Sequence, residues 1–451
     1  MPARLIESLA TTEPLAEIFS DQSVLQAMLD FEAALARAEA RVGVIPESAA
    51  RVIRNAAKAD AFDTTTLAAE ILRAGTPGIP LVKRLTDRVR AKNANTARYV
   101  HWGATSQDVA DTALLVLLKK AQSILNSDLA RLQRALKKLS HEHKSTIMLG
   151  RTLMQPAPPV TFGLKAAAWF ASVNRSRRHL DDAFAEALVV QFGGASGTLA
   201  SLGKQGVEVT RNLANELNLG VPDAPWHTQR DRLAALLCSC GVLTGALGKM
   251  ARDISLMMQS EVAEVAEPGG QGRGGSSTMP HKQNPIGCSF TLAAAQRVPG
   301  LVASFLSGMV QEHERGVGGW QAEWPTVASI IQATGLALAS TAEVAEGLSV
   351  HKTKMRAHLD ATEGLVFAER ATMLLGAKLG RDVAHRIIEE AIRKNKKQKR
   401  HLVEVLIEIP EVTQHLDLKT LRHIEVPEEY LGSAEVFRKA LLSSSRKTKK
   451  K

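Results

Sequence analysis

A polar, glycine-rich segment, EPGGQGRGGSSTMPHKQNPIG at residues 267–287, separates two long helical patterns in this chain. Loops of this length within compact domains are usually functional lids or disordered linkers. Successive glycines let backbone N–H groups turn toward an anion, while Ser276 and Ser277 add hydroxyl groups and Lys282 adds a positive charge. From these residues alone, both a flexible linker and a site that binds a carboxylate beside a serine stay open.

The sequence on either side of this loop predicts long helices. Residues 229–265 form a helical pattern without proline that would reach about 55 Å, and similar patterns cover 285–312 and 322–347. A further pattern covers 112–144, and the prolines of PAPPVTFG (156–163) stand where another helix can begin. Helices of this length need partners of similar length to bury their apolar stripes. We therefore expect a bundle that other copies of the chain complete.

The composition indicates an all-α fold. Hydrophobic residues make up 45% of the 451 residues, but aromatic residues only 4%, which disfavours a β-sandwich or barrel. The expected organisation is an N-terminal helical domain over 1–111, a central long-helix bundle over 112–350, and a small helical domain over 351–451 that ends in a basic disordered tail.

The net charge of +11 is concentrated in two short tracts. Residues 391–400 hold six basic residues and residues 446–451 hold five, with no acidic residue in either tract, so the remaining chain is balanced. Binding to nucleic acid would need a basic face across the fold. We therefore expect solvated charge and no nucleic-acid partner.

The cysteines and the apolar runs indicate a cytoplasmic, soluble chain. Cys238, Cys240 and Cys288 are too few for a disulfide framework and show no metal-ligand spacing, so we expect no metal. The uncharged run at 233–248 has sixteen residues, fewer than the ~20 that span a bilayer. Residues 1–14 lack the apolar region of a signal peptide.

Three motifs identify a resemblance to a known family. GSSTMPHKQNP (275–285) resembles the signature of the fumarase/aspartase superfamily, and HWGATSQDVADTA (101–113) and GRTLMQPAPPVTFG (150–163) resemble its two other characteristic regions. The resemblance implies a three-domain, all-α subunit with a long central bundle. It also implies a homotetramer whose active sites are shared between subunits, and a reaction on a small-molecule substrate without any cofactor.

The superfamily removes or adds a proton at a carbon next to a carboxylate, through an aci-carboxylate dianion that fixed donors must stabilise. By this resemblance, Ser276 is the catalytic serine of the loop, and Lys282 and Asn284 hold a substrate carboxylate. The other implied substrate-binding residues are His101, Thr105, Ser106, Arg151, Thr152, Gln155 and Arg315. For His101, a structural role in its loop also stays open.

Within the superfamily the chain looks most similar to the 3-carboxy-cis,cis-muconate cycloisomerase family, notably in PWHTQRDRL (225–233) and QEHERGVGGWQAEW (311–324). Most relatives have a His at the position of Leu153, and many pair it with a Glu at the position of Ser289. Both are absent here. A cycloisomerase can lack them because its nucleophile is a carboxylate, already ionised at neutral pH, which needs no general base.

The resemblance therefore implies an intramolecular lyase that converts 3-carboxy-cis,cis-muconate to 4-carboxymuconolactone in protocatechuate degradation by the β-ketoadipate pathway. Two alternatives stay open. Adenylosuccinate lyase shares the motifs but should carry a His at position 153. A non-catalytic relative would suit the missing pair, although the intact loop motif at 275–285 opposes it.

Overall fold

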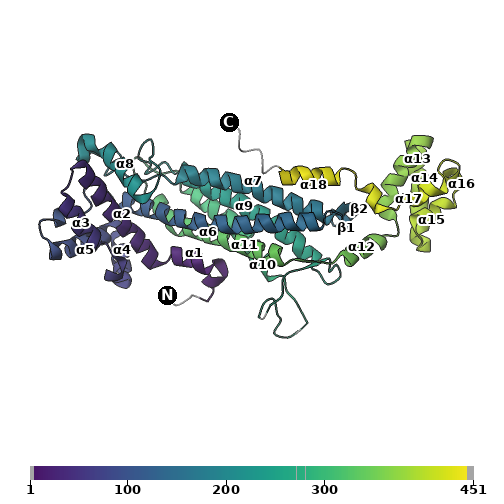
Figure 1. Ribbon diagram of the computed structural model, residues 1–451, viewed down its shortest axis with the longest axis horizontal. Coiled ribbons are helices and arrows are strands. Elements are labelled where there is room, and N and C mark those ends of the chain that lie inside the picture. Colours follow the sequence, from purple (N-terminus) through teal and green to yellow (C-terminus); the bar gives the residue numbers. More distant parts are fainter. Residues whose placement is uncertain (1–4, 271, 280, 444–451) are drawn as a thin grey trace. The chain divides into compact units, whose positions relative to one another are not determined.

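The computed structural model describes residues 5–270, 272–279 and 281–443, and these residues are mainly helical (Figure 1). The predicted all-α class is confirmed in this respect. The contacts within the chain define two compact units, each built from three separate stretches. The first contains the residues up to Ala130 together with Ser176–Gly248 and Phe290–Ser340, and the second contains Arg131–Arg175, Lys249–Ser289 and the residues from Thr341 onward.

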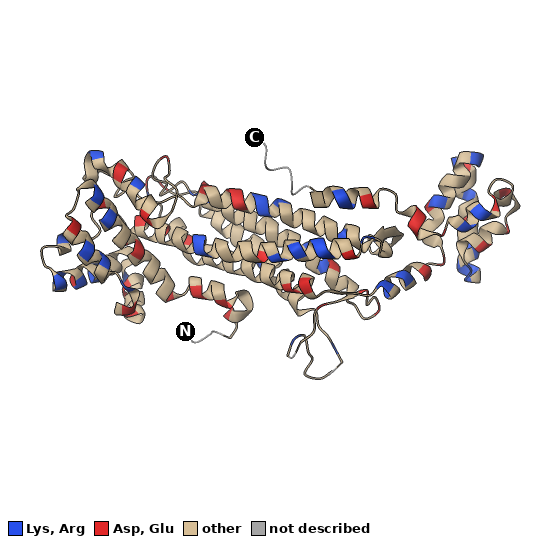
Figure 2. Ribbon diagram, in the orientation of Figure 1, with Lys and Arg blue, Asp and Glu red and all other residues tan. Residues whose placement is uncertain are grey.

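The long helices contribute segments to both units. They are α6 (Ser106–Glu142), α7 (Phe162–Ala187), α9 (Asp231–Met257), α10 (Ile286–Ser307) and α11 (Gly319–Gly347). Figure 2 shows few charged residues along α9, α10 and α11. By length and composition α9 and α11 could each cross a membrane, but 56% and 67% of their most apolar windows are buried, as in core helices of soluble proteins.

The first unit also contains α2, which is as long as α10, and a set of shorter helices. They are η1 (Glu7–Ala10), α1 (Glu13–Ile18), α2 (Asp21–Val42), α3 (Glu47–Ala56), η2 (Ala59–Ala61), α4 (Thr64–Ala74), α5 (Gly78–Lys92), η3 (Ala97–Tyr99), η4 (Ala200–Gln205) and α8 (Gly206–Leu217). Ser20 caps the start of α2, and its hydroxyl accepts a hydrogen bond from the Ser23 backbone N–H at 3.2 Å; Gly43, with φ 78°, caps the end of the helix. Such a left-handed end favours glycine. Helix α2 packs against α3 and α8.

The second unit adds two antiparallel strand pairs and the C-terminal helices. Its elements are β1 (Ile147–Thr152), β2 (Gln155–Thr161), β3 (Val265–Ala266), β4 (Ser349–Val350), α12 (Lys352–Asp360), η5 (Leu365–Phe367), α13 (Ala368–Leu379), α14 (Arg381–Gln398), α15 (Leu402–Ile407), α16 (Pro410–Thr413), α17 (Leu418–His423), η6 (Pro427–Tyr430) and α18 (Ala434–Ser443). Strand β1 pairs with β2, and β3 pairs with β4. The C-terminal helices close around a core that includes Phe367, Leu375 and Leu402.

The β1–β2 hairpin corrects one expectation about secondary structure. The prolines of PAPPVTFG do not begin a helix, because residues 155–161 form β2 and α7 begins only at Phe162. Proline is compatible with a strand that has an unpaired edge, and β2 pairs on one side only, with β1. The domain boundaries predicted after residues 111 and 350 stay a prediction. The expected Lys-rich tail at 446–451 lies outside the described residues.

Candidate active site

The N-terminus of α6 carries two predicted site residues, Thr105 and Ser106. Asp108, three positions after Thr105, accepts a hydrogen bond from the Thr105 backbone N–H at 3.0 Å, which is the reach-back contact of a capping box. The same buried carboxylate accepts the backbone N–H groups of Gly193 and Gly194 at 3.1 and 2.9 Å. Asp108 therefore fixes the start of α6 against the loop at 193–194.

A buried ion network stabilises this region from within the first unit. The guanidinium of Arg230 is fully buried and pairs with Asp111 at 2.7 Å and with Glu323 at 2.5 Å. Burial acts to lower the pKa of Arg230, but the charges of Asp111 and Glu323 outweigh it, so the pKa is raised. The indole of Trp320 also donates to Asp111, at 3.0 Å. This network fixes the segments around Arg230 and Trp320 against α6.

The structure brings Arg315 to the same region. Its guanidinium donates to the backbone carbonyls of Gly194 and Ala195 at 3.0 and 2.8 Å, and more weakly to the side chain of Gln107 at 3.4 Å. Gln107 directly follows Ser106, so Arg315 lies beside the start of α6. This placement is compatible with the predicted contact to a substrate carboxylate.

His101 is held by a buried carboxylate. Its Nδ1 lies 2.6 Å from Oε1 of Glu32, which is fully buried on α2. Burial acts to lower the pKa of His101, but the charge and hydrogen bond of Glu32 and the charge of Asp108 outweigh it, so the pKa is raised. The backbone of His101 is left-handed, with φ 59°, a conformation that costs a non-glycine residue energy and often occurs at functional sites.

The β1–β2 hairpin carries Arg151, Thr152 and Gln155. Arg151 forms a two-point ion pair with Glu264, with distances of 2.9 and 2.7 Å. His358 also contacts Glu264 through its Nδ1, at 2.8 Å. Thr152 and Gln155 pair across the hairpin and are exposed. Because Glu264 already occupies the guanidinium of Arg151, a substrate carboxylate would have to compete with it there.

The tip of this hairpin consists of two exposed apolar residues. Leu153 is 97% exposed and Met154 is 71% exposed, with φ angles of 51° and 66°. A two-residue turn with both φ values positive favours Asn and Gly, so this sequence is unfavourable in isolation. Leu153 occupies the position where the superfamily usually has a His.

The loop between β3 and α10 positions the predicted catalytic serine. The hydroxyl oxygen of Ser276 accepts hydrogen bonds from the backbone N–H groups of Met279 and Thr278, at 3.0 and 3.3 Å. Such donors stabilise negative charge on the oxygen. The side chain of Lys282 is exposed in the same loop. The local geometry is therefore suited to a serine that gives up and takes back a proton.

The two ends of this loop are tied together. Glu267, at its start, accepts the backbone N–H groups of Gly287 and Cys288 in the first turn of α10, at 2.9 and 2.8 Å, where a carboxylate is favoured by the helix dipole. Further along, the backbone N–H of Asn284 donates to the carbonyl of Gly274 at 2.8 Å. The part of the loop that carries Ser276 and Lys282 thus lies between two segments that hydrogen bonds hold together.

The predicted site residues fall into two sets. The first unit brings together His101, Thr105, Ser106 and Arg315 through the contacts of Glu32, Asp108 and Gln107. The second unit contains Arg151, Thr152, Gln155, Ser276, Lys282 and Asn284, on the hairpin and the loop. The roles assigned to all of these residues stay predictions.

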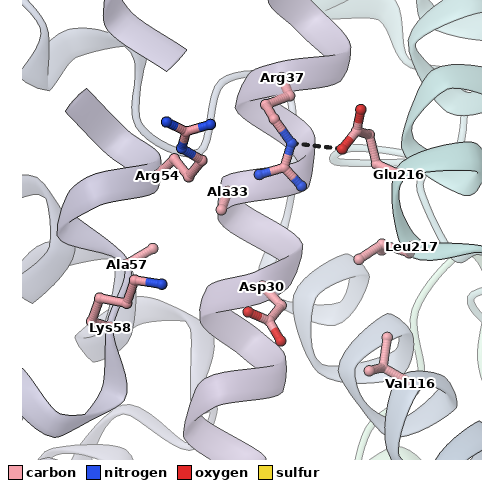
Figure 3. Close-up of a pocket in the computed structure, with 9 residues that line it drawn as sticks. All are labelled: Asp30, Ala33, Arg37, Arg54, Ala57, Lys58, Val116, Glu216 and Leu217. Atoms are coloured by element: carbon pink, nitrogen blue, oxygen red, sulfur yellow. Dashed lines mark hydrogen bonds and ion pairs between the residues drawn. The ribbon is translucent and has the colours of Figure 1, made fainter. Parts of the chain in front are cut away.

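A separate cavity of about 380 Å³ lies in the first unit (Figure 3). Its lining residues are Asp30, Ala33, Arg37, Arg54, Ala57, Lys58, Val116, Glu216 and Leu217. Figure 3 shows the ion pair between Arg37 and Glu216, which measures 2.6 Å. The predicted site residues do not line this cavity, so it is distinct from the predicted site.

Metal binding and thiol chemistry find little support in the part of the chain that the structure describes. Within residues 5–270, 272–279 and 281–443, no cluster of three His, Cys, Asp or Glu side chains is arranged to hold a metal ion. Burial raises the pKa of the Cys240 thiol to about 12 and also raises that of Cys288, so these thiols are unreactive at neutral pH.

Comparisons with known proteins decide the family. The lyase family model matches residues 7–300, and the model of the adenylosuccinate lyase C-terminus matches residues 364–440. The chain belongs to the lyase family. This lyase is 48% identical to a 3-carboxy-cis,cis-muconate cycloisomerase of Bradyrhizobium diazoefficiens, over 94% of each chain. It is 45% identical to the cycloisomerase of Pseudomonas aeruginosa, over 96% of this chain and 95% of the relative.

A solved structure shows the same relationship. The 3-carboxy-cis,cis-muconate lactonizing enzyme of Pseudomonas putida matches this lyase with a TM-score of 0.92 at 43% identity, over 98% of this chain and 99% of that chain. The resemblance to the superfamily, and within it to the cycloisomerases, is therefore confirmed.

The structure also shows residues that the sequence analysis missed. Asp108 lies within the motif at 101–113, and its spacing from Thr105 matches a capping box. Glu32 stands, with Glu39, on the otherwise apolar buried side of α2, and a carboxylate within that apolar pattern could have been noticed in the sequence. Glu264 and Glu267 carried no such signal, because their partners are distant in sequence or are backbone groups.

Proposed function

We propose that this lyase is a 3-carboxy-cis,cis-muconate cycloisomerase, an intramolecular lyase that forms 4-carboxymuconolactone in protocatechuate degradation by the β-ketoadipate pathway. The observation that carries the proposal is the near-complete match to enzymes of that name at 42–48% identity. The local geometry of the loop, with Ser276 beside backbone donors, is consistent with it.

The proposed reaction needs one C–O bond and one C–H bond to form. A carboxylate oxygen of the substrate attacks one alkene carbon. The electron pair of the double bond moves onto the neighbouring carbon and its carboxylate, which gives the aci-carboxylate. Ser276 then delivers a proton to that carbon, and solvent reprotonates the serine. Lys282 and Asn284 stabilise the charge that develops on the carboxylate.

The absence of a histidine at position 153 agrees with this chemistry. The attacking carboxylate has a reference pKa near ~4 and is ionised at neutral pH, so no base is needed at the position of Leu153. The exposed apolar tip formed by Leu153 and Met154 cannot exchange protons. A lyase that expels a poor leaving group would require an acid at that point.

Turnover of defined substrates tests the activity. Purified protein should remove the ultraviolet absorbance of 3-carboxy-cis,cis-muconate and act much more slowly on unsubstituted cis,cis-muconate. Adenylosuccinate is the control for the rival lyase. Rapid turnover of adenylosuccinate would contradict the proposal, and so would a failure to turn over any of the three compounds.

We also propose a homotetramer with active sites shared between subunits. Its support is the outward face of the long helices, where Ala235, Val242 and Gly245 of α9 and Ala293 and Gly300 of α10 are exposed and uncharged. Such faces are suited to packing against helices of other copies. Sedimentation should give a tetramer that retains activity, and a stable active monomer would contradict this assembly.

The proposed enzyme is cytoplasmic and uses neither a metal nor an organic cofactor. Its cysteines, Cys238, Cys240 and Cys288, are free thiols in the structure, which suits a reducing compartment. All three should titrate with a thiol reagent in denatured, unreduced protein. Exhaustive chelation should leave turnover unchanged, and a loss that an added metal restores would contradict this part of the proposal.

A further inference from the structure

Two carboxyl groups of α2 are buried in the first unit with few polar partners. Glu32 and Glu39 are 1% and 0% exposed. Oε1 of Glu32 contacts His101, while its Oε2 and both carboxyl oxygens of Glu39 have no hydrogen-bond partner among the described residues. Burial, and secondarily the charge of Glu32, raise the pKa of Glu39 to about 9. At neutral pH Glu39 is therefore protonated.

The contact with Glu32 determines what the other nitrogen of His101 can do. Because Nδ1 is committed to Glu32, Nε2 is the nitrogen left for a ligand, and it has no partner among the residues that the structure describes. A neutral ring that donates its Nδ1–H presents a lone pair at Nε2, which repels a carboxylate. A protonated ring presents an N–H donor there instead.

The charged groups around His101 favour the protonated ring. Glu32 faces it from α2 and Asp108 faces it from α6, and both are acidic. Asp108 in turn contacts Nε2 of the buried His227 at 2.7 Å. Glu39, seven residues after Glu32 on the same helix, adds no charge at neutral pH. His101 remains 16% exposed and lies four residues before Thr105, at the region predicted to bind substrate.

We propose that Glu32 is a positioning residue that keeps the His101 ring protonated and oriented, so that its Nε2–H donates to one carboxylate of the substrate. This inference rests on the proposed function, whose substrate carries three carboxylates. Glu32 does not touch the substrate; it acts through His101. A purely structural role, in which the pair only ties α2 to the loop at residue 101, predicts different behaviour with pH.

The test compares Glu32→Gln with a matched control, Glu39→Gln, which changes a neighbouring carboxyl group that is already uncharged. In histidine-labelled, full-length protein without substrate, NMR titration should show wild-type His101 above its ordinary pKa of 6.5. Glu32→Gln should lower that value by about one unit or more, whereas Glu39→Gln should leave it in place. The variant His101→Gln assigns the resonance.

Kinetics supply the second readout. The kcat/KM of the wild type should fall as pH rises through the pKa of His101, and in Glu32→Gln this fall should begin at lower pH. Above the pKa of His101 the variant should lose kcat/KM in proportion to the protonated fraction, which falls by about tenfold for each unit by which the pKa drops. In the His101→Gln background, Glu32→Gln should cause no further loss, because its partner is already gone.

Specific results would overturn the inference. They are a wild-type His101 that titrates at or below 6.5, an unchanged titration in Glu32→Gln, or an equal kinetic loss with and without His101. If Glu32→Gln fails to fold, two measurements still test the inference. One is the titration of His101 in the wild type, and the other is the titration of His101 in Glu32→Asp, whose carboxylate lies one methylene farther from the ring. Failure of the wild type to turn over 3-carboxy-cis,cis-muconate would instead contradict the proposed function, since the titration needs no substrate.

Discussion

Replacing Glu39 by Met should stabilise the protein, and by more as the pH rises. Glu39 is fully buried on α2, and neither of its carboxyl oxygens has a hydrogen-bond partner among the described residues. Methionine has a similar length and no group that needs a partner. Removing an unsatisfied buried polar group in favour of an apolar one of similar shape is commonly neutral or stabilising.

The magnitude follows from the protonation equilibrium. The pKa of Glu39 is about 9 in the folded protein, against a reference of 4.5. Between these values the unfolded chain is ionised and the folded chain is not, so unfolding releases a proton and becomes easier as pH rises. At pH 7 the difference of about 2.5 units corresponds to roughly 3 kcal/mol. At pH 5 the same calculation gives less than about 1 kcal/mol.

The assay is denaturant unfolding of wild type and Glu39→Met at equal protein concentration, at pH 5, 6, 7 and 8. The difference in the free energy of unfolding should grow by about 1.4 kcal/mol per pH unit. Other titrating groups cancel in the difference between the two proteins. A difference that stays constant with pH would show that Glu39 is ionised in the folded state and would refute the reasoning.

Four further outcomes concern the predicted site. Ser276→Ala should lower kcat by about 10²-fold or more with little change in KM, because it removes a positioned proton donor; near wild-type turnover would mean that another group delivers the proton. Lys282→Ala should raise KM and lower kcat together in the same steady-state assay, because its charge acts on bound substrate and dianion alike. Leu153→His should bring no gain in kcat, and a faster variant would argue that a base is needed there. Gly78→Ala would place a Cβ 2.6 Å from the Cα of Ser106, so thermal unfolding should show a loss of about 1–3 kcal/mol; an unchanged melting temperature would show that α5 can move aside.

The helices were predictable because their signals are local and periodic. The pattern at 322–347 matches α11, which spans Gly319–Gly347. The pattern at 285–312 matches the start of α10 to within one residue, but the helix ends at Ser307, five residues before the predicted end. The hairpin was not predicted, because its prolines in PAPPVTFG also suit a helix start. Only pairing with β1 decides between the two, and the turn that joins the strands, Leu153-Met154, lacks the Asn or Gly that usually signals a hairpin.

The site was predictable only in part, for a physical reason. Residues such as Ser276 and Lys282 stand within a motif of unusual composition, so a single stretch of sequence points to them. Glu32 and Glu264 act through partners 69 and 113 residues away, and such pairings arise only when the chain has folded.

The way the long helices are shared has a consequence for how this protein can be divided. Each of α6, α7, α9, α10 and α11 begins in one compact unit and ends in the other. No single cut in the chain therefore releases either unit whole. A recombination event that exchanged one unit would have to join the chain at several points at once. The units should thus be inherited, expressed and lost together, and insertions should be tolerated best at the exposed hairpin tip formed by Leu153 and Met154, which lies outside the shared helices.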